Sequence, residues 1–68
     1  MTFGERVKQL REERKMRPSY LAMEARTQMG VIYSYENESR MPRIDMFMRL
    51  CEAFEITPNE FLEEVKFN

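Results

Sequence analysis

The hydrophobic positions at the start of the chain follow a helical spacing. Phe3, Val7 and Leu10 are separated by four and then three residues, which places them on one face of an α-helix. Thr2 precedes this run and Glu5 follows Thr2 by three residues, which is the arrangement of a capping box. The pattern predicts a first helix over about residues 2–15.

The middle of the chain predicts two short helices joined by a turn. Pro18 favours a helix start, because its fixed φ suits the first turn of a helix. Ala22 and Ala25 are small side chains that let a neighbouring helix approach closely. Thr27 or Gln28 is expected to cap the next helix, which ends near residue 37. Its apolar positions are Val31, Ile32 and Tyr35.

The last third of the chain predicts two more helices. Pro42 ends a polar loop, and the apolar face of the helix after it consists of Ile44, Phe47, Leu50, Cys51 and Phe54. Thr57, Pro58 and Glu60 form a helix start with a capping box. The apolar face of this final helix consists of Phe61, Leu62 and Val65. Since no strand pattern occurs, the sequence predicts an all-α fold of five short helices in one domain over residues 1–68.

The charges are distributed unevenly along the chain. The net charge is −1, but residues 1–43 hold nine basic and six acidic residues, a balance of +3. Residues 44–68 hold two basic and six acidic residues, a balance of −4. A basic front and an acidic rear would allow one face to meet phosphates, although the charges alone also fit a mixed, solvated surface.

Several function classes are disfavoured by what the sequence lacks. Cys51 is the single cysteine and there is no histidine, so a disulfide within the chain is impossible and a zinc site lacks ligands. The missing histidine and the absence of a nucleotide-binding glycine pattern argue against an enzyme and against a cofactor. We expect a cytoplasmic protein without a signal peptide, a membrane span or a small-molecule ligand.

Three segments carry a resemblance to a known family. They are residues 7–14, the pair Leu21–Ala22 followed by Ile32 and Tyr35–Asn37, and residues 42–62. Their joint spacing resembles that of the lambda-repressor/Cro-like (XRE-type) helix-turn-helix family. The resemblance implies a compact five-helix domain with its helix-turn-helix at about residues 18–37. It also implies a sequence-specific transcriptional regulator, commonly a repressor, that binds double-stranded DNA in the nucleoid as a homodimer on a pseudo-palindromic operator.

The chain departs from the family's pattern at several turn positions. The family usually has glycine where this chain has Arg26, Glu38 and Glu55. A left-handed residue other than glycine costs on the order of 1 kcal/mol. Pro18 replaces a glutamine that contacts a phosphate in the family, and Arg17 is expected to supply that contact instead.

The resemblance places the helix over residues 28–37 in the major groove of DNA. The expected base-reading residues are Gln28, Met29, Gly30, Tyr33 and Ser34. Glutamine pairs with adenine and a methionine can pack on a thymine methyl, so we expect an A/T-rich site. The expected phosphate contacts are Arg11, Arg17, Arg26, Asn37, Arg40 and Arg43.

Two further expectations concern contacts of the protein with itself. The resemblance implies an ion pair between Arg11 and Glu36 that ties the reading helix to the first helix. The expected dimer interface consists of Ile56, Phe61, Val65 and Phe67. The alternative function is a protein-interaction module on the same fold with weak or lost DNA binding, for which Met29 and Tyr33 would form the contact patch.

Overall fold

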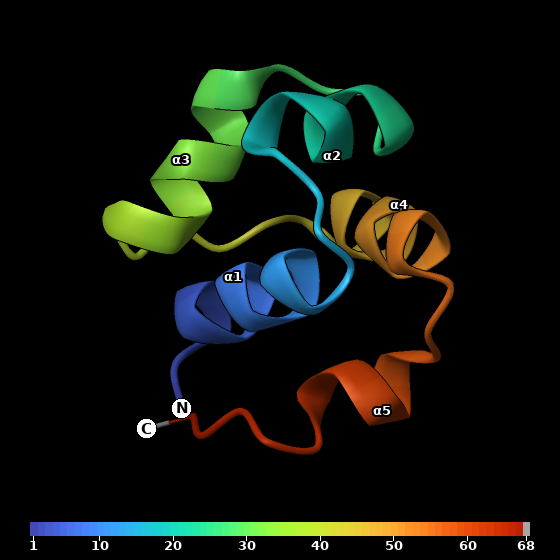
Figure 1. The fold of residues 1–68 in the computed structure, drawn as a ribbon. Helices are drawn as coiled ribbons and strands as arrows, with labels where there is room; N and C mark the ends of the chain where they lie inside the picture. Colours follow the sequence, from blue (N-terminus) through green and yellow to red (C-terminus); the bar gives the residue numbers. More distant parts are fainter. Residues whose placement is uncertain (68) are drawn as a thin grey trace.

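The computed structural model describes residues 1–67 of the chain. This part of the chain forms five helices and no strand (Figure 1), which confirms the predicted all-α fold. The helices are α1 (Phe3–Glu13), α2 (Pro18–Glu24), α3 (Met29–Asn37), α4 (Ile44–Phe54) and α5 (Pro58–Leu62). Among these described residues, no helix is long and apolar enough to cross a bilayer. Figure 1 shows α2 and α3 on one side of the molecule, α5 on the opposite side, and α1 and α4 between them.

Capping boxes begin the first and last helices as predicted. The Thr2 side chain accepts a hydrogen bond from the Glu5 backbone N–H at 3.1 Å, and Glu5 accepts one from the Thr2 N–H at 2.8 Å. Thr57 and Glu60 repeat this arrangement at α5. Both helices end earlier than predicted. Lys15 adopts a left-handed φ of 54°, which stops α1 before it, and α5 ends before Val65, which is half-buried beyond the helix.

The core contains fourteen buried apolar side chains with members in all five helices. Phe61 is fully buried, with its ring stacked on that of Phe3 at 5.3 Å and edge-on to that of Phe47 at 5.0 Å. The prediction that Phe61 belongs to a dimer interface is therefore wrong. Helix α5 has only five residues, and Phe61 is the buried one that anchors it.

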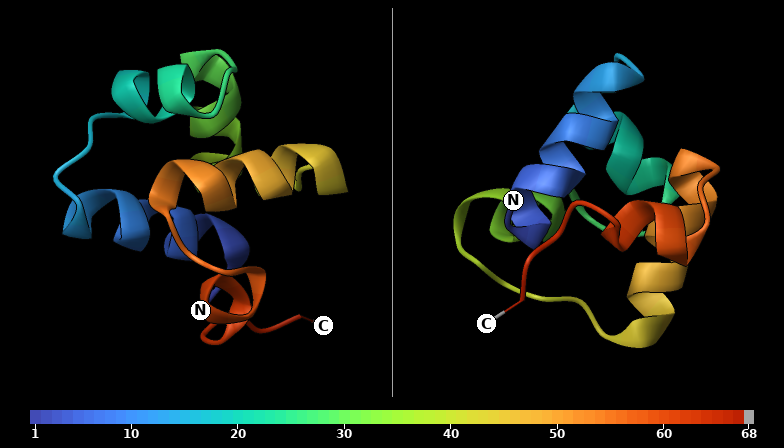
Figure 2. Two further views of the ribbon diagram at one scale, coloured as in Figure 1. Left: turned by 90° about the vertical axis from the view of Figure 1, so that its right-hand side faces the viewer. Right: turned by 90° about the horizontal axis from the view of Figure 1, so that it is seen from below.

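The placement of Ile44 on the apolar face of α4 is also wrong. Ile44 is the first residue of α4 and its side chain is 73% exposed. At this end of the helix the core is reached by Met46 and Phe47 instead, which are 7% and 8% exposed. Spacing alone placed Ile44 in the core, but it is the first residue of α4, and the left view of Figure 2 shows this end of α4 projecting beyond the other helices.

Two arginines, Arg6 in α1 and Arg14 at its C-cap, bind the carboxyl ends of other helices. The Arg14 Nε donates a hydrogen bond to the Phe54 carbonyl at the end of α4, at 3.0 Å. The Arg6 Nε and Nη2 donate to the carbonyls of Phe61 and Glu60 in α5, at 2.8 and 2.7 Å. The last carbonyls of a helix lack partners within the helix and carry partial negative charge. A guanidinium that donates to them therefore satisfies these acceptors and is attracted to their charge. These arginines fix α4 and α5 against α1.

Among residues 1–67, four residues other than glycine adopt left-handed backbone conformations: Lys15, Arg26, Ser39 and Glu55. Two of the three turn positions at which the family usually has glycine, Arg26 and Glu55, are among them. The third is not, because Glu38 has a φ of −121° and the left-handed residue is Ser39, one position later. Each such residue costs on the order of 1 kcal/mol.

Candidate nucleic-acid interface

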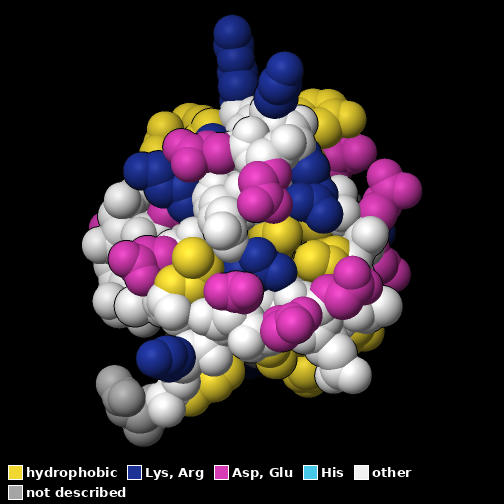
Figure 3. Space-filling view, turned by 60° about the horizontal axis from the view of Figure 1, so that its bottom comes forward, with side chains coloured by type: hydrophobic (Ala, Val, Ile, Leu, Met, Phe, Trp, Pro, Cys, Tyr) yellow, Lys and Arg dark blue, Asp and Glu magenta, His cyan; other side chains and the backbone are white. Residues whose placement is uncertain are grey.

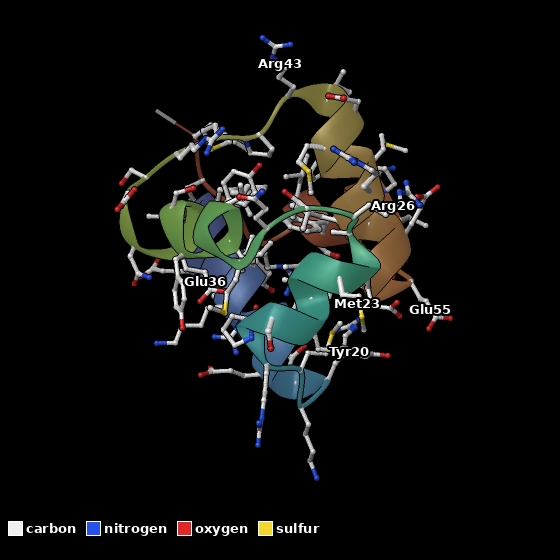
Figure 4. All side chains as sticks on the ribbon, turned by 90° about the horizontal axis from the view of Figure 1, so that it is seen from above. Tyr20, Met23, Arg26, Glu36, Arg43 and Glu55 are labelled. Atoms are coloured by element: carbon white, nitrogen blue, oxygen red, sulfur yellow. The ribbon has the colours of Figure 1, made fainter. Side chains whose placement is uncertain are left out.

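Helices α2 and α3 pack closely around a short turn. Ala22 and Ala25 are 4% and 0% exposed, and their small side chains let α3 approach α2. Arg26 reverses the chain with a φ of 59°, and the Thr27 N–H then donates to the Ala22 carbonyl at 2.8 Å. The turn therefore fixes the angle at which α3 leaves α2. Figure 4 views the molecule from the side on which these two helices lie.

Two side chains of α4 hold this turn in place. The Arg49 Nη1 donates to the Arg26 carbonyl at 3.2 Å, and the Arg26 Nη2 lies 3.3 Å from a Glu52 carboxylate oxygen. Both partners of the second contact are about two-thirds exposed, at 64% and 68%. The role of Arg49 was not predicted, because only the folded structure shows which carbonyl its side chain reaches.

One side of α3 and its cap is open to solvent. Met29 and Tyr33 are 44% and 46% exposed, and a Cβ added at Gly30 would have no atom within 4 Å. We call this surface the α3 face, and it consists of Gln28, Met29, Gly30, Tyr33 and Asn37, all exposed. Four of them are predicted base-reading residues, and Asn37, predicted as a phosphate contact, shares the face by its helical spacing from Tyr33.

Ser34 does not belong to the α3 face, although it was predicted as a base reader. Its side chain is buried at 7% exposure, and its hydroxyl donates to the Val31 carbonyl one turn earlier at 2.6 Å. A buried side chain whose hydroxyl is bonded to its own helix is not available to a base edge. The prediction for Ser34 is wrong in this structure.

The ion pair expected between Arg11 and Glu36 is formed. The Arg11 Nε and Nη2 donate to the two Glu36 carboxylate oxygens at 2.9 and 3.1 Å, and Arg11 Nη1 donates to the Met16 carbonyl at 2.9 Å. The side chains are only 12% and 4% exposed. Hydrogen bonding to Glu36 raises the pKa of the Arg11 guanidinium. Because its three nitrogens all bond within the protein, Arg11 ties α1, the connector after it and α3 together, and its phosphate contact stays a prediction.

Exposed arginines lie at both ends of the helix pair. Arg17 is the N-cap residue of α2 and makes no capping hydrogen bond with its side chain. Arg40 lies in the loop after α3, with its guanidinium 5.9 Å from the centre of the Tyr35 ring. Arg43 is the N-cap of α4, also without a side-chain capping bond, and Figure 4 shows it projecting from the edge of the molecule.

A cavity of about 340 Å³ lies between α3 and the start of α4. Its lining includes three arginines, Arg40, Arg43 and Arg49, one acidic residue, Asp45, and the hydroxyl-bearing residues Thr27 and Tyr35. Burial raises the pKa of the Tyr35 phenol, which therefore stays protonated and able to donate a hydrogen bond. Guanidinium groups, hydroxyls and the free N–H groups at the start of α4 are all donors that suit a phosphate oxygen.

The opposite face of the molecule has a different character. Figure 3 shows the side on which α1 and α5 lie, where acidic side chains alternate with Lys and Arg. Such a surface offers no continuous basic area to a polyanion. The donor groups described above and the α3 face therefore form the stronger candidate for a nucleic-acid interface.

Comparison with known protein families gives one match. Residues 4–66 match the model of a family described as a helix-turn-helix domain, which falls in the XRE-like helix-turn-helix group. The match spans α1 to α5. A comparison with curated individual proteins found no match.

Proposed function

Because the chain belongs to the helix-turn-helix domain family, we propose that it is a sequence-specific regulator of transcription, acting as a repressor and binding double-stranded DNA as a homodimer. The observation that carries the proposal is the α3 face, which is open and flanked at both ends by exposed arginines. In a helix-turn-helix protein the second helix enters the major groove and its N-terminal residues meet base edges.

The chemistry of the α3 face supports an A/T-rich operator. Gln28 stands at the start of α3, where its amide can pair with adenine, and Met29 offers a thioether to a thymine methyl. Gly30 leaves room for the backbone to approach the bases, since nothing occupies the space beside it. Tyr33 and Asn37 extend the same face by one and two turns.

The phosphate contacts in this proposal come from Arg17 on one side and from Arg40 and Arg43 on the other. Arg17 compensates for Pro18, which has neither a side-chain donor nor an N–H. Arg26 is expected to contribute less to phosphate binding, because its guanidinium already contacts Glu52. Contacts of this kind position the protein without reading sequence.

Selection of bound duplexes from a random pool, at two salt concentrations, tests the proposal. We expect a palindrome whose half-sites lie about 34 Å apart, with log K falling by about 0.9 per phosphate contact for each unit of log salt. Arg43→Gln is expected to reduce this slope by about 1 for every sequence. Lys66→Gln removes the same charge from the C-terminal segment and should leave the slope unchanged. Gln28→Ala is expected to relax the preference at one base pair, at a cost of about 1–3 kcal/mol.

The second candidate function is a protein-interaction module on the same fold. The observation that favours it is the exposure of Met29 and Tyr33, which could contact a protein as well as bases. If the selection enriches no sequence and shows no salt-dependent binding, the regulator proposal is contradicted and this second candidate is favoured. Loss of partner binding in Tyr33→Ala would then identify the same surface.

A further inference from the structure

The α3 face carries no charged group. Glu36 is the only charged residue among residues 28–37, and its side chain is 4% exposed and held in an ion pair. The face therefore lacks the arginine or lysine that makes the commonest specific contact in the major groove, a two-bond pairing with guanine. It presents instead two amides, from Gln28 and Asn37, and two large side chains with apolar surfaces.

An empty position interrupts this face at Gly30. A Cβ added there has no atom within 4 Å, so there is room beside the backbone for a group at least as large as a methyl. Met29 precedes Gly30, and Tyr33 follows Gly30 by three residues, which on a helix places it one turn further along the same side. The Met29 and Tyr33 side chains are 44% and 46% exposed. We call this feature the Gly30 recess, an open place flanked by Met29 and Tyr33.

We propose that the Gly30 recess receives the 5-methyl group of a pyrimidine, so that the methylation state of the operator controls binding. The inference rests on the proposed function, because α3 must enter the major groove for this contact to form. The methyl of thymine is the one apolar group that the four bases present in that groove. 5-Methylcytosine carries the same group on the same ring carbon, whereas cytosine and uracil lack it.

The surroundings of the recess favour a methyl over the polar groups of a base edge. Gly30 has no side chain that could pair with a donor or an acceptor, the thioether of Met29 is only a weak acceptor, and the phenol hydroxyl of Tyr33 lies at the far end of its side chain. A base amino or carbonyl group placed here would lose its water without gaining a strong partner, which is unfavourable. A methyl has no such bonds to lose, and its removal from water is favourable.

Methylation of a cytosine at the contacted position would therefore raise the affinity of an operator. Unmodified cytosine leaves the recess empty, and methylating it restores the contact, so that at this point a methylated C·G pair is bound as a T·A pair is. Gly30 determines this specificity, because any larger residue would place its own Cβ where the base methyl lies.

Single-base changes in the selected operator test the inference with the natural chain. Each thymine of a half-site is replaced in turn by uracil, which removes only the methyl group and keeps every hydrogen-bonding group. We expect one position at which the Kd, measured by fluorescence anisotropy, rises by about fourfold for a change in one half-site and by about 15-fold for a change in both. At that position, 5-methylcytosine is expected to bind about fourfold more tightly than cytosine in each half-site.

Gly30→Ala tests whether the recess is the part of α3 that receives the methyl. Its Cβ fills the recess, so binding to the thymine duplex is expected to weaken, whereas binding to the uracil duplex weakens less or improves. The ratio of the two Kd values should fall from about fourfold to about one. Arg43→Gln is the matched control, because loss of a phosphate contact is expected to weaken both duplexes equally and keep the ratio at about fourfold. Circular dichroism checks that both variants fold.

The results of these experiments distinguish this inference from the proposed function. If the selection enriches an operator but no uracil substitution changes the Kd, the methyl contact is overturned and the regulator stands. The contact at Gly30 is also overturned if Gly30→Ala weakens binding to the thymine and uracil duplexes by the same factor. If the selection enriches no sequence, the proposed function is overturned and this inference fails with it.

Discussion

The two glycines of the chain have opposite surroundings, although both lie inside helices. A Cβ at Gly4 would collide with the Tyr35 carbonyl oxygen and come within 3.1 Å of the Glu36 Cα. A Cβ at Gly30 would meet nothing within 4 Å. Neither glycine has a positive φ, so the two positions differ in the room beside the Cα atom and not in backbone conformation. Gly4 brings α1 against the last turn of α3, and Gly30 leaves a gap on the α3 face.

Alanine at these two positions should therefore change stability in opposite directions. Gly4→Ala forces two backbones apart and is expected to destabilise the fold by about 1–3 kcal/mol. Gly30→Ala improves helix propensity and is expected to stabilise it by about 0.5–1 kcal/mol, while weakening DNA binding. Urea denaturation measures the two free energies of unfolding. Equal shifts in the two variants would contradict the close packing at Gly4.

The thiol of Cys51 is expected to be unreactive in the folded protein. Burial raises its pKa, so the folded pKa lies above the unfolded one of about 8.5. The thiol therefore contributes stability that is complete below pH 8.5 and is lost as the pH rises towards the folded pKa. Stability should fall as the pH rises above about 8.5 in the natural chain and should fall less in Cys51→Ala. Ellman's reagent should react with the natural chain rapidly only in denaturant.

Sequence spacing predicted most buried residues but not every orientation. Phe3, Val7 and Leu10 are buried as their spacing indicated. Ile44 was placed in the core by its spacing, but a periodic pattern gives the face of a helix and not where the neighbouring helix stops. Ser34 was placed on the outer face by the resemblance, and the structure buries it. Hydrogen bonds between distant segments, such as that from Arg14 to Phe54, depend on the assembled fold and leave no local signal in the sequence.

At the scale of elements, an ion pair between α1 and α3 fixes the position of the helix that carries the α3 face. Arg11 and Glu36 form a two-bond ion pair that is almost fully buried. The exposed pair of Arg26 and Glu52 joins α4 to the turn through a single longer contact. The two pairs have the same chemistry but differ in burial, which makes the second a matched control for the first. The sequence resemblance predicted only the buried pair.

Double-mutant cycles should measure the difference. Arg11→Ala or Glu36→Ala leaves a buried charge without its partner and is expected to cost about 3–5 kcal/mol. The coupling energy of this pair is expected to be about 1–3 kcal/mol. The Arg26–Glu52 pair is solvent-screened, and its coupling should not exceed about 1 kcal/mol. A coupling energy near zero for Arg11 and Glu36 would show that they do not stabilise the position of α3.

At the scale of the whole molecule, a single core joins every helix. In the described part of the chain, thirteen buried side chains from the five helices and that of Ala25, which follows α2, form one cluster within a body of 29 × 24 × 23 Å. The proposal of one domain therefore predicts one cooperative transition on heating. A chain of 68 residues should unfold with a calorimetric enthalpy of about 45–50 kcal/mol near 60 °C. Two resolved transitions, or a van't Hoff enthalpy well below the calorimetric one, would contradict a single domain.

The order of helices and the capping boxes at Thr2 and Thr57 could be predicted from the sequence, since both depend on neighbours within a few residues. Gln28 is the N-cap of α3, but its side chain makes no capping hydrogen bond. The charge division between residues 1–43 and 44–68 also indicated a possible DNA-facing side. The sequence could not predict which side chains of distant segments share one surface, because this depends on how loop 38–43 positions α4 relative to α3. The apolar groove lined by Phe3, Met41, Ile44 and Phe67, which come from both ends and the middle of the chain, is the clearest example.

The seven methionines of the chain supply it with built-in spectroscopic probes. Met29 lies on the α3 face, Met46 is in the core and Met23 is exposed on α2. Labelling the methyl groups with carbon-13 would give each of these places its own NMR signal. Adding DNA should move the Met29 signal, loss of the fold should move that of Met46, and Met23 serves as the internal reference. One labelled sample can therefore follow DNA binding and core packing separately, without any substitution.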